Sequence, residues 1–505
     1  NGGALSRAAS TRFGGFTTRL LVIVLLVVMA LGMTWPLVLE LNTAVPGPPW
    51  DNMVWLYDLW WFRHSLVELG ELPTFNSTIF YPFGYDLRLS ETMLANKLLI
   101  APVLIWGNEV LAYNVLLLLT FVLTGYATYL LVAYWTDNPY AGVVAGVILA
   151  FCPYRMHAVA AGWLPLLSTQ WMPLVLLYLE RTIREGHARH AWLAGLFAAL
   201  TFLSSWYYVY VFGSMLAVYL LIRLRPWRET WRDRRLMGRL LCAFGVALVL
   251  TLPVALPVMR GSQGQMGWQL AEVDKWSASV DDLLLPSVYH PVWGQRVLAS
   301  RAQNPRYPWY APGFISLGLV ALFLALLAIG RPRALRRVTT PLAWVGVISA
   351  LLALGVVLRY AGRVVQVPVS EQVSQLFVRG ASALMSKWAL NRASLYELEI
   401  VSGHVPVLLP ALLVYLFVPL GSALRTLYRF GWMTELAVAL LAGLGAARML
   451  GGGRSLDAAT AVEGQRDLRA AERRPVLGPA AGAIVLVALV LAESLCAPLA
   501  YGLSE

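Results

Sequence analysis

Two acidic side chains follow the first long apolar run of the chain. Asp51 comes directly after a proline-rich stretch, and Asp58 follows it seven residues later. Leucine and aromatic side chains recur at helical spacing in this region, so 52–66 is expected to form an amphipathic helix at the membrane interface. Two helical turns put both carboxylates on one face, about 10 Å apart along the axis. That separation is too wide for joint metal chelation, so one carboxylate is expected to be chemical and the other structural.

A third acidic residue, Glu91, closes the same segment. A carboxylate at the membrane border can act as a general base toward a hydroxyl group. It can equally be a solvated loop residue, and Asp51 can equally be a helix cap. Spacing alone leaves both alternatives open.

The composition indicates that these side chains belong to a membrane protein. Of the residues, 59% are hydrophobic and 13% are charged, against about 25% charged in soluble domains. Apolar runs of bilayer length, about 20 residues, recur along the whole chain, and the first is too long for a cleaved signal. The sequence therefore predicts an all-α polytopic membrane protein with about 11–13 transmembrane helices. Spans are expected near 17–38, 110–133, 139–152, 163–180, 190–204, 206–223, 237–257, 312–330, 340–358, 433–450 and 475–497.

The net charge of +12 does not indicate nucleic-acid binding, because the basic residues cluster in short loops between apolar runs. These basic loops are 181–189, 223–239, 331–337 and 451–474. With a cytoplasmic amino terminus, and with neither 92–107 nor 404–420 crossing, all of them are inside and the carboxyl terminus is outside, as the positive-inside rule favours. If both stretches crossed, the basic short loops between them would be on the wrong face. The expected organisation is a transmembrane domain over 1–450, a cytoplasmic linker over 451–474 and a C-terminal helix within 475–505.

The same topology puts three long segments, 39–91, 259–311 and 359–403, on the outer face. Two apolar stretches, 92–107 and 404–420, are short and broken by prolines. They are expected to be re-entrant or interfacial elements that frame a cavity on the outer side.

Several other classes are disfavoured. The cysteines stand alone, and no histidine pair or cysteine set has haem or metal spacing, so no haem, flavin or nucleotide cofactor is expected. Transporters tend to place ionisable groups near the bilayer midplane, whereas the candidate acids here lie at the border.

Several sequence blocks recur in the order of a known family. They are Asp51 with a Trp-rich helix ending in His64, then "FNSTIFYPFGYDLRLSE" at 75–91, "AYN" at 112–114, "FCPYRMHAV" at 151–159, "QWMPL" at 170–174, "SSWYY" at 204–208 and "VPVLLPALLVYLFVPLGSALRTLYRF" at 405–430. The chain resembles the GT-C superfamily of polytopic glycosyltransferases, in particular a poorly characterised bacterial branch.

The resemblance implies that a polyprenyl-phosphate-linked sugar donor meets a glycan, lipid or protein acceptor at the outer face of the bacterial plasma membrane, in the cell envelope. It implies that Asp51 acts as general base or metal ligand, with Glu91 as the second acid or ligand and Mg²⁺ or Mn²⁺ as the candidate metal. Partner membrane proteins are also expected.

The departing group would be a polyprenyl phosphate, which needs nearby cations, and arginine binds phosphate in a bidentate way. Arg155, Arg425 and Arg429 are the arginines that the topology puts at the outer face, although interfacial arginines also snorkel. The substrate-binding candidates are Asp58, His64, Tyr81, Arg155, His157, Arg425 and Arg429.

Departures from the branch pattern keep other functions open. A second histidine is expected shortly after His157, where the chain reads Ala161-Gly162-Trp163-Leu164, and Trp50 stands where glycine usually precedes the aspartate. Many relatives also continue into an outer soluble domain beyond the position of Glu505. The alternative is a non-catalytic membrane subunit of a larger assembly, with a transporter or lipid flippase less favoured.

Overall fold

The computed structural model describes residues 15–503, apart from 92, 262–266, 303–314, 330–332, 392, 420, 452–477, 498 and 500. The predicted linker 451–474, beyond its first residue, lies outside this described part. The α-helices are α2 (Phe16–Met33), α3 (Asp51–Arg63), α4 (Leu94–Trp106), α5 (Glu109–Thr136), α6 (Pro139–Ala150), α7 (Pro153–Ala160), α8 (Met172–Glu185), α9 (Ala188–Ser204), α10 (Trp206–Arg223), α11 (Trp227–Arg232), α12 (Arg234–Gly261), α13 (Leu270–Lys275), α14 (Gly294–Arg301), α15 (Leu319–Ala328), α16 (Arg333–Ala353), α17 (Glu371–Trp388), α18 (Pro410–Phe417), α19 (Gly431–Met449) and α20 (Pro479–Ser494).

The remaining elements are short. Tight helical turns are η1 (Leu37–Leu39), η2 (His64–Leu69), η3 (Leu87–Leu89), η4 (Leu164–Leu167), η5 (Val280–Leu283), η6 (Leu395–Glu397), η7 (Gly421–Ala423) and η8 (Leu427–Phe430). Strands are β1 (Ala44–Pro46), β2 (Phe75–Asn76), β3 (Tyr85–Asp86), β4 (Arg359–Tyr360), β5 (Arg363–Val364), β6 (Gln366–Pro368), β7 (His404–Pro406) and β8 (Tyr501–Leu503). They form four antiparallel pairs, β1–β8, β2–β3, β4–β5 and β6–β7.

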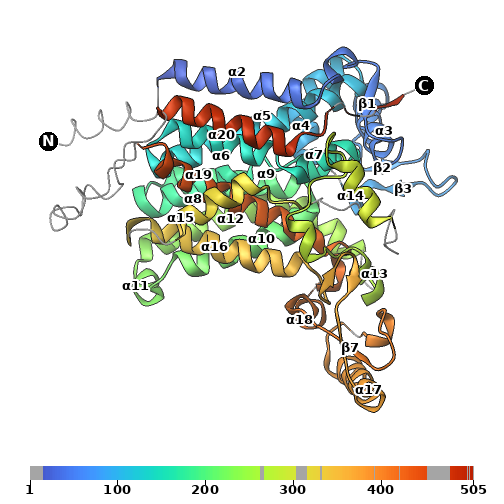
Figure 1. The fold of residues 1–505 in the computed structure, drawn as a ribbon. Coiled ribbons are helices and arrows are strands. Elements are labelled where there is room, and N and C mark those ends of the chain that lie inside the picture. Colours follow the sequence, from blue (N-terminus) through green and yellow to red (C-terminus); the bar gives the residue numbers. More distant parts are fainter. Residues whose placement is uncertain are drawn as a thin grey trace, which may run out of the picture.

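The long helices run side by side in one bundle (Figure 1). In the described part, six helical segments are long and apolar enough to cross a membrane: α2, α5, α6 with α7, α10, α12, and η8 with α19. Three further apolar helices, α4, α15 and α20, are shorter than these six segments. The predicted all-α polytopic membrane fold is confirmed.

The centre of the bundle is packed through small residues, which let helix backbones approach closely. The span that contains α19 is wholly buried in the bundle. A Cβ atom on Gly146 of α6 would lie 2.5 Å from the carbonyl oxygen of Gly125 on α5. A Cβ atom on Gly445 of α19 would overlap the backbone oxygen of Leu324 on α15.

Gly445→Ala is therefore expected to destabilise the chain by about 1–3 kcal/mol, the usual cost of overpacking. The control is Gly245→Ala on α12, where a new Cβ would meet open space and alanine favours the helix. Thermal unfolding of both variants in detergent checks the prediction. Equal melting temperatures would contradict the packing described here.

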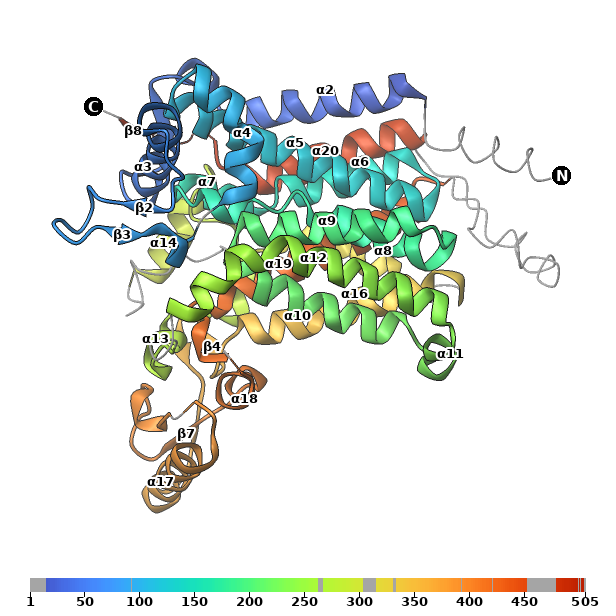
Figure 2. The same ribbon diagram turned by 180° about the vertical axis from the view of Figure 1, so that it is seen from behind.

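The three long segments gather at one end of the bundle, which is called the loop end here (Figures 1 and 2). The loop end carries α3 and the β2–β3 hairpin, α13 and α14, and the β4–β7 region with α17. The opposite end carries α11 and the start of α2.

The two ambiguous apolar stretches are too short to cross a bilayer alone. The first forms α4, whose 13 residues span about 20 Å, against a hydrocarbon core of about 30 Å. The second forms β7 and then α18, which has 8 residues. Their re-entrant or interfacial placement stays a prediction.

The predicted helix at 52–66 is present as α3, which continues into the π-helical turn η2. Its cap differs from the proposed one. Asn52 Oδ1 accepts hydrogen bonds from the backbone N–H groups of Trp50 and Met53, each at 3.0 Å. Trp50 is the N-cap and Asp51 the first helical residue, and no side chain caps α3, so Asp51 is not the cap.

Candidate functional site

Glu91 lies at the junction between α9 and α10. Ser205, which separates these helices, has an extended backbone, so the first N–H groups of α10 are free of helical partners. Glu91 Oε1 accepts a hydrogen bond from the Trp206 backbone N–H at 2.9 Å, and Oε2 accepts one from Ser205 Oγ at 3.3 Å. The carboxylate therefore occupies the N-terminus of a helix, a position that favours negative charge.

Burial dominates the protonation of this carboxylate. Desolvation raises the pKa of Glu91 to about 7, while the Trp206 N–H and the Arg429 charge act in the opposite direction. A carboxyl group with a pKa near neutral pH is suited to general acid–base catalysis, because both of its protonation states are accessible.

Arg429, in η8, supplies the positive charge at this site. Its guanidinium lies 3.3 Å from the centre of the Tyr207 ring on α10. Its Nε and Nη1 atoms are buried and have no hydrogen-bond partner among the described residues. Buried guanidinium donors normally have partners, and their natural acceptors are carboxylate and phosphate oxygens. Arg429 is thus equipped to receive an anion.

Asp58 and Lys97 form a mostly buried ion pair beside Glu91. Lys97 Nζ lies 2.8 Å from the Asp58 carboxylate and joins α4 to α3. Burial raises the pKa of Asp58, although the charge of Lys97 opposes this shift. The Asp58 charge in turn raises the pKa of Glu91. Asp58 therefore acts as a structural and electrostatic neighbour of Glu91.

A buried polar cluster lies next to Glu91 and was not predicted from the sequence. Asn96 Nδ2 donates to Ser168 Oγ at 2.5 Å, and Asn96 Oδ1 accepts from Gln170 Nε2 and Ser204 Oγ, each at 3.3 Å. All four side chains are fully buried. The cluster fixes α4 against the segment before α8 and against the end of α9, which positions the loop that carries Glu91.

Asp51 is exposed at the start of α3, and none of the ion pairs among the described residues includes it. The charged groups that act on Glu91 are Arg429 and Asp58, and Asp51 is two helical turns from Asp58, about 10 Å along the axis. Electrostatic interactions connect Glu91 with Arg429 and with Asp58, and Asp51 lies two turns before Asp58 on the same face of α3.

Arg155 does not serve as a free phosphate ligand. It is fully buried and donates to the backbone oxygens of Ala150 and Leu167 at 2.9 and 2.6 Å. It also donates to the hydroxyls of Thr169 and Thr120. These bonds occupy all three of its nitrogens, so its observed role is to join helices α5 to α7.

Two further candidates, His157 and Arg425, contact side chains other than Glu91. His157 is buried between the rings of Trp163 and Tyr289. Arg425 pairs with Glu272 at 2.5 Å; burial raises the pKa of Glu272, but hydrogen bonds from Trp276 and Arg425 bring it below its usual value.

Two candidates of the first loop are at the surface. His64 pairs with Glu68 at 2.8 Å and stacks on Trp60. Tyr81 is 85% exposed, between the strands of the β2–β3 hairpin that extends outward from the loop end (Figure 1). Neither contacts Glu91 in the described structure.

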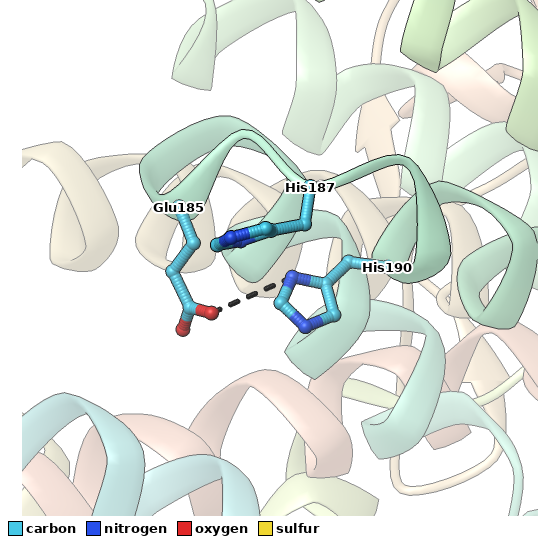
Figure 3. Close-up of side chains that lie close together, drawn as sticks. All are labelled: Glu185, His187 and His190. Carbon is cyan, nitrogen blue, oxygen red and sulfur yellow. Dashed lines mark ion pairs between the residues drawn. The ribbon is translucent and has the colours of Figure 1, made fainter. Parts of the chain in front are cut away.

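One group of neighbouring side chains consists of residue types that can bind a metal ion. Among the described residues, Glu185, His187 and His190 alone offer three histidine, cysteine or carboxylate ligand atoms within 4.8 Å of one another (Figure 3). Arg189 Nε lies 3.3 Å from His190 Nε2, and Arg181 Nε lies 3.8 Å from Glu185. These cations oppose a metal ion. The group also lies at the start of α9, about 20 Å along the axis from the end that faces Glu91.

Asp51 and Glu91, the candidate ligands for Mg²⁺ or Mn²⁺, are not part of such a group. A divalent cation held by one or two carboxylates and by substrate phosphate oxygens needs no such group, so the metal stays a prediction, and no catalytic step is assigned to it.

Comparisons with known proteins give one family and a weak structural likeness. The model of a family described as "Domain of unknown function (DUF6311)" matches residues 74–380. No curated protein matches the chain. Among solved structures, the chain is similar to arabinofuranosyltransferase AftD from Mycobacteria, at 13% identity and a TM-score of 0.42, over 94% of this chain and 27% of that one. It is also similar to the archaeal oligosaccharyltransferase AglB from Archaeoglobus fulgidus, at 15% identity and a TM-score of 0.42, over 94% of this chain and 56% of that one.

Proposed function

Since the chain belongs to the DUF6311 family, whose description names no activity, we propose from its site that it is a membrane glycosyltransferase. It transfers a sugar from a polyprenyl-phosphate donor to a hydroxyl acceptor at the loop end, on the outer face of a bacterial plasma membrane. One observation carries the proposal: the Glu91 carboxylate, held at the N-terminus of α10 by the Trp206 N–H and Ser205 Oγ, interacts with an arginine that has unpaired buried donors, Arg429.

The chemistry follows from these two side chains. The Glu91 carboxylate takes the proton of the acceptor hydroxyl as its oxygen attacks the anomeric carbon. The bond between that carbon and the phosphate oxygen breaks, and the electron pair leaves with the polyprenyl phosphate. Arg429 Nε and Nη1 donate hydrogen bonds to the departing phosphate oxygens, where negative charge develops.

Asp51 is proposed to orient the acceptor by accepting a charge-assisted hydrogen bond from a second hydroxyl, a bond that a neutral amide oxygen makes more weakly. The first test is glycosyl transfer from radiolabelled polyprenyl-phosphate sugars in membranes that contain the wild type or Asp51→Asn, with a native membrane extract as the source of acceptors. The wild type is expected to transfer label, and the variant to lose most of this activity at unchanged protein level. Full activity in Asp51→Asn would remove Asp51 from the site.

The second candidate function is a non-catalytic membrane subunit of a larger assembly. The exposure of Asp51 and its distance from Asp58 favour this alternative. Absence of transfer by the wild type across a panel of sugar donors would support it, and copurification would then identify the assembly.

A further inference from the structure

Helix α17 has three distinct faces. The side chains of Ser374, Val378, Ser382 and Met385 are buried and follow each other at helical spacing. Two hydrogen bonds fix this face: Ser374 Oγ donates to the His404 carbonyl at 2.7 Å, and Ser382 Oγ accepts from the Leu395 N–H at 3.0 Å. The helix therefore cannot rotate to bury a different face.

The second face is apolar but exposed. Val373, Leu376, Leu384 and Trp388 are 51%, 74%, 61% and 67% exposed. Their spacing of three, eight and four residues keeps them on one stripe at 3.6 residues per turn. Gly380 falls on the same stripe.

The third face is polar and also exposed. It carries Gln372, Gln375, Arg379 and Ser386, which lie on the far side of the helix from the apolar stripe. The exposed apolar face of α17 is therefore not needed to pack the helix against the rest of the described chain.

The place of α17 in the molecule indicates what covers this stripe. The helix lies past the loop end of the bundle and to one side of it, and it is seen nearly end-on in both views while the bundle helices run across them (Figures 1 and 2). It is therefore transverse to the spans, as a helix lying on a membrane would be. Between α17 and the bundle lies α18 (Figures 1 and 2), whose Leu413 and Phe417 are also exposed.

We propose that α17 is an interfacial helix whose Val373–Leu376–Leu384–Trp388 stripe inserts into the lipid surface beside the bundle. Trp388 at its end is a side chain favoured at the membrane interface. The helix has few charges, Glu371, Arg379 and Lys387, so the contact is apolar and does not require anionic lipid. The inference holds whether or not the chain is an enzyme.

The test is a spin-label scan of α17 in the full chain reconstituted in nanodiscs of neutral phosphatidylcholine. Single cysteines are placed at 372, 373, 375, 376, 379, 384, 386 and 388 in a Cys242→Ser background, since the other two cysteines are buried. All scanned positions are exposed, so no label disturbs the core. Collision with oxygen, which concentrates in lipid, is compared with collision with a water-soluble nickel chelate.

Oxygen accessibility is expected to be several-fold higher at 373, 376, 384 and 388, and nickel accessibility to be higher at 372, 375, 379 and 386. High nickel accessibility on both faces would overturn the proposal, because the stripe would face water. Low accessibility of the stripe to both reagents would also overturn it, because a protein surface would then cover the stripe.

Discussion

Glu91→Gln is expected to lower glycosyl transfer by about 10²- to 10⁴-fold, the usual contribution of a general base. Glutamine has the same shape and can still accept the hydrogen bond from the Trp206 N–H, but it cannot take a proton. The loss should appear in the rate at saturating donor, because the side chain acts on the reacting hydroxyl. Initial rates in membranes at pH 7.5 measure it.

The same variant should not weaken the fold. Burial raises the pKa of folded Glu91 from its usual value of 4.5 to about 7, so the folded state loses stability as pH rises between these two values, and the loss is complete above pH 7. Glutamine does not ionise, and its thermal stability at pH 8 should match or exceed that of the wild type. Glu71→Gln, at an exposed position of the same loop, is the control for both measurements. A stable Glu91→Gln protein with wild-type activity would exclude Glu91 as the base.

Two arginines that share the same sequence prediction are expected to differ sharply when replaced by glutamine. Arg155→Gln removes a buried donor set and leaves carbonyl and hydroxyl acceptors without partners, which should cost at least about 3 kcal/mol. Arg429→Gln should cost less stability, because Nε and Nη1 have no hydrogen bonds to lose and the main loss is the contact with the Tyr207 ring. It should instead lower transfer by about 10²- to 10³-fold, as expected for a donor to the departing group.

Melting temperature in detergent and transfer rate in membranes, measured on both variants, separate the two roles. Arg425→Gln is a suitable control, since Arg425 is partly exposed and paired with Glu272. An Arg429→Gln protein that unfolds like Arg155→Gln would show that Arg429 is structural. A stable Arg155→Gln protein that has lost only transfer would reverse the assignment.

The membrane architecture was predictable because its signal is local. Runs of apolar residues long enough for a bilayer gave most of the helices, and the spacing of apolar side chains gave α3. The prolines of 92–107 and 404–420 agree with the short helices found there, α4 and α18, and the re-entrant or interfacial placement of both stretches stays a prediction.

The site was predictable only in part, because contacts between distant segments decide the roles of its side chains. Arg155 and Arg429 look alike in sequence, and only their neighbours show that one is satisfied and the other is not. Lys97 lies in an apolar stretch, and nothing local connects it with Asp58, 39 residues earlier. The Asn96 cluster likewise joins residues 72 and 108 positions apart. Asp51, the leading candidate from the sequence, is exposed at the start of α3, and its role stays a prediction.

The most direct test of the central claim is the pH dependence of transfer by the wild type and Glu91→Gln in the same membranes, from pH 5.5 to 8.5. The carboxylate form of Glu91 is the base, so the wild-type rate should fall about tenfold per pH unit below a pKa of about 7. The Glu91→Gln rate should be low and lack this dependence. A variant with the same rate and the same pH profile as the wild type would contradict the claim that Glu91 accepts the proton.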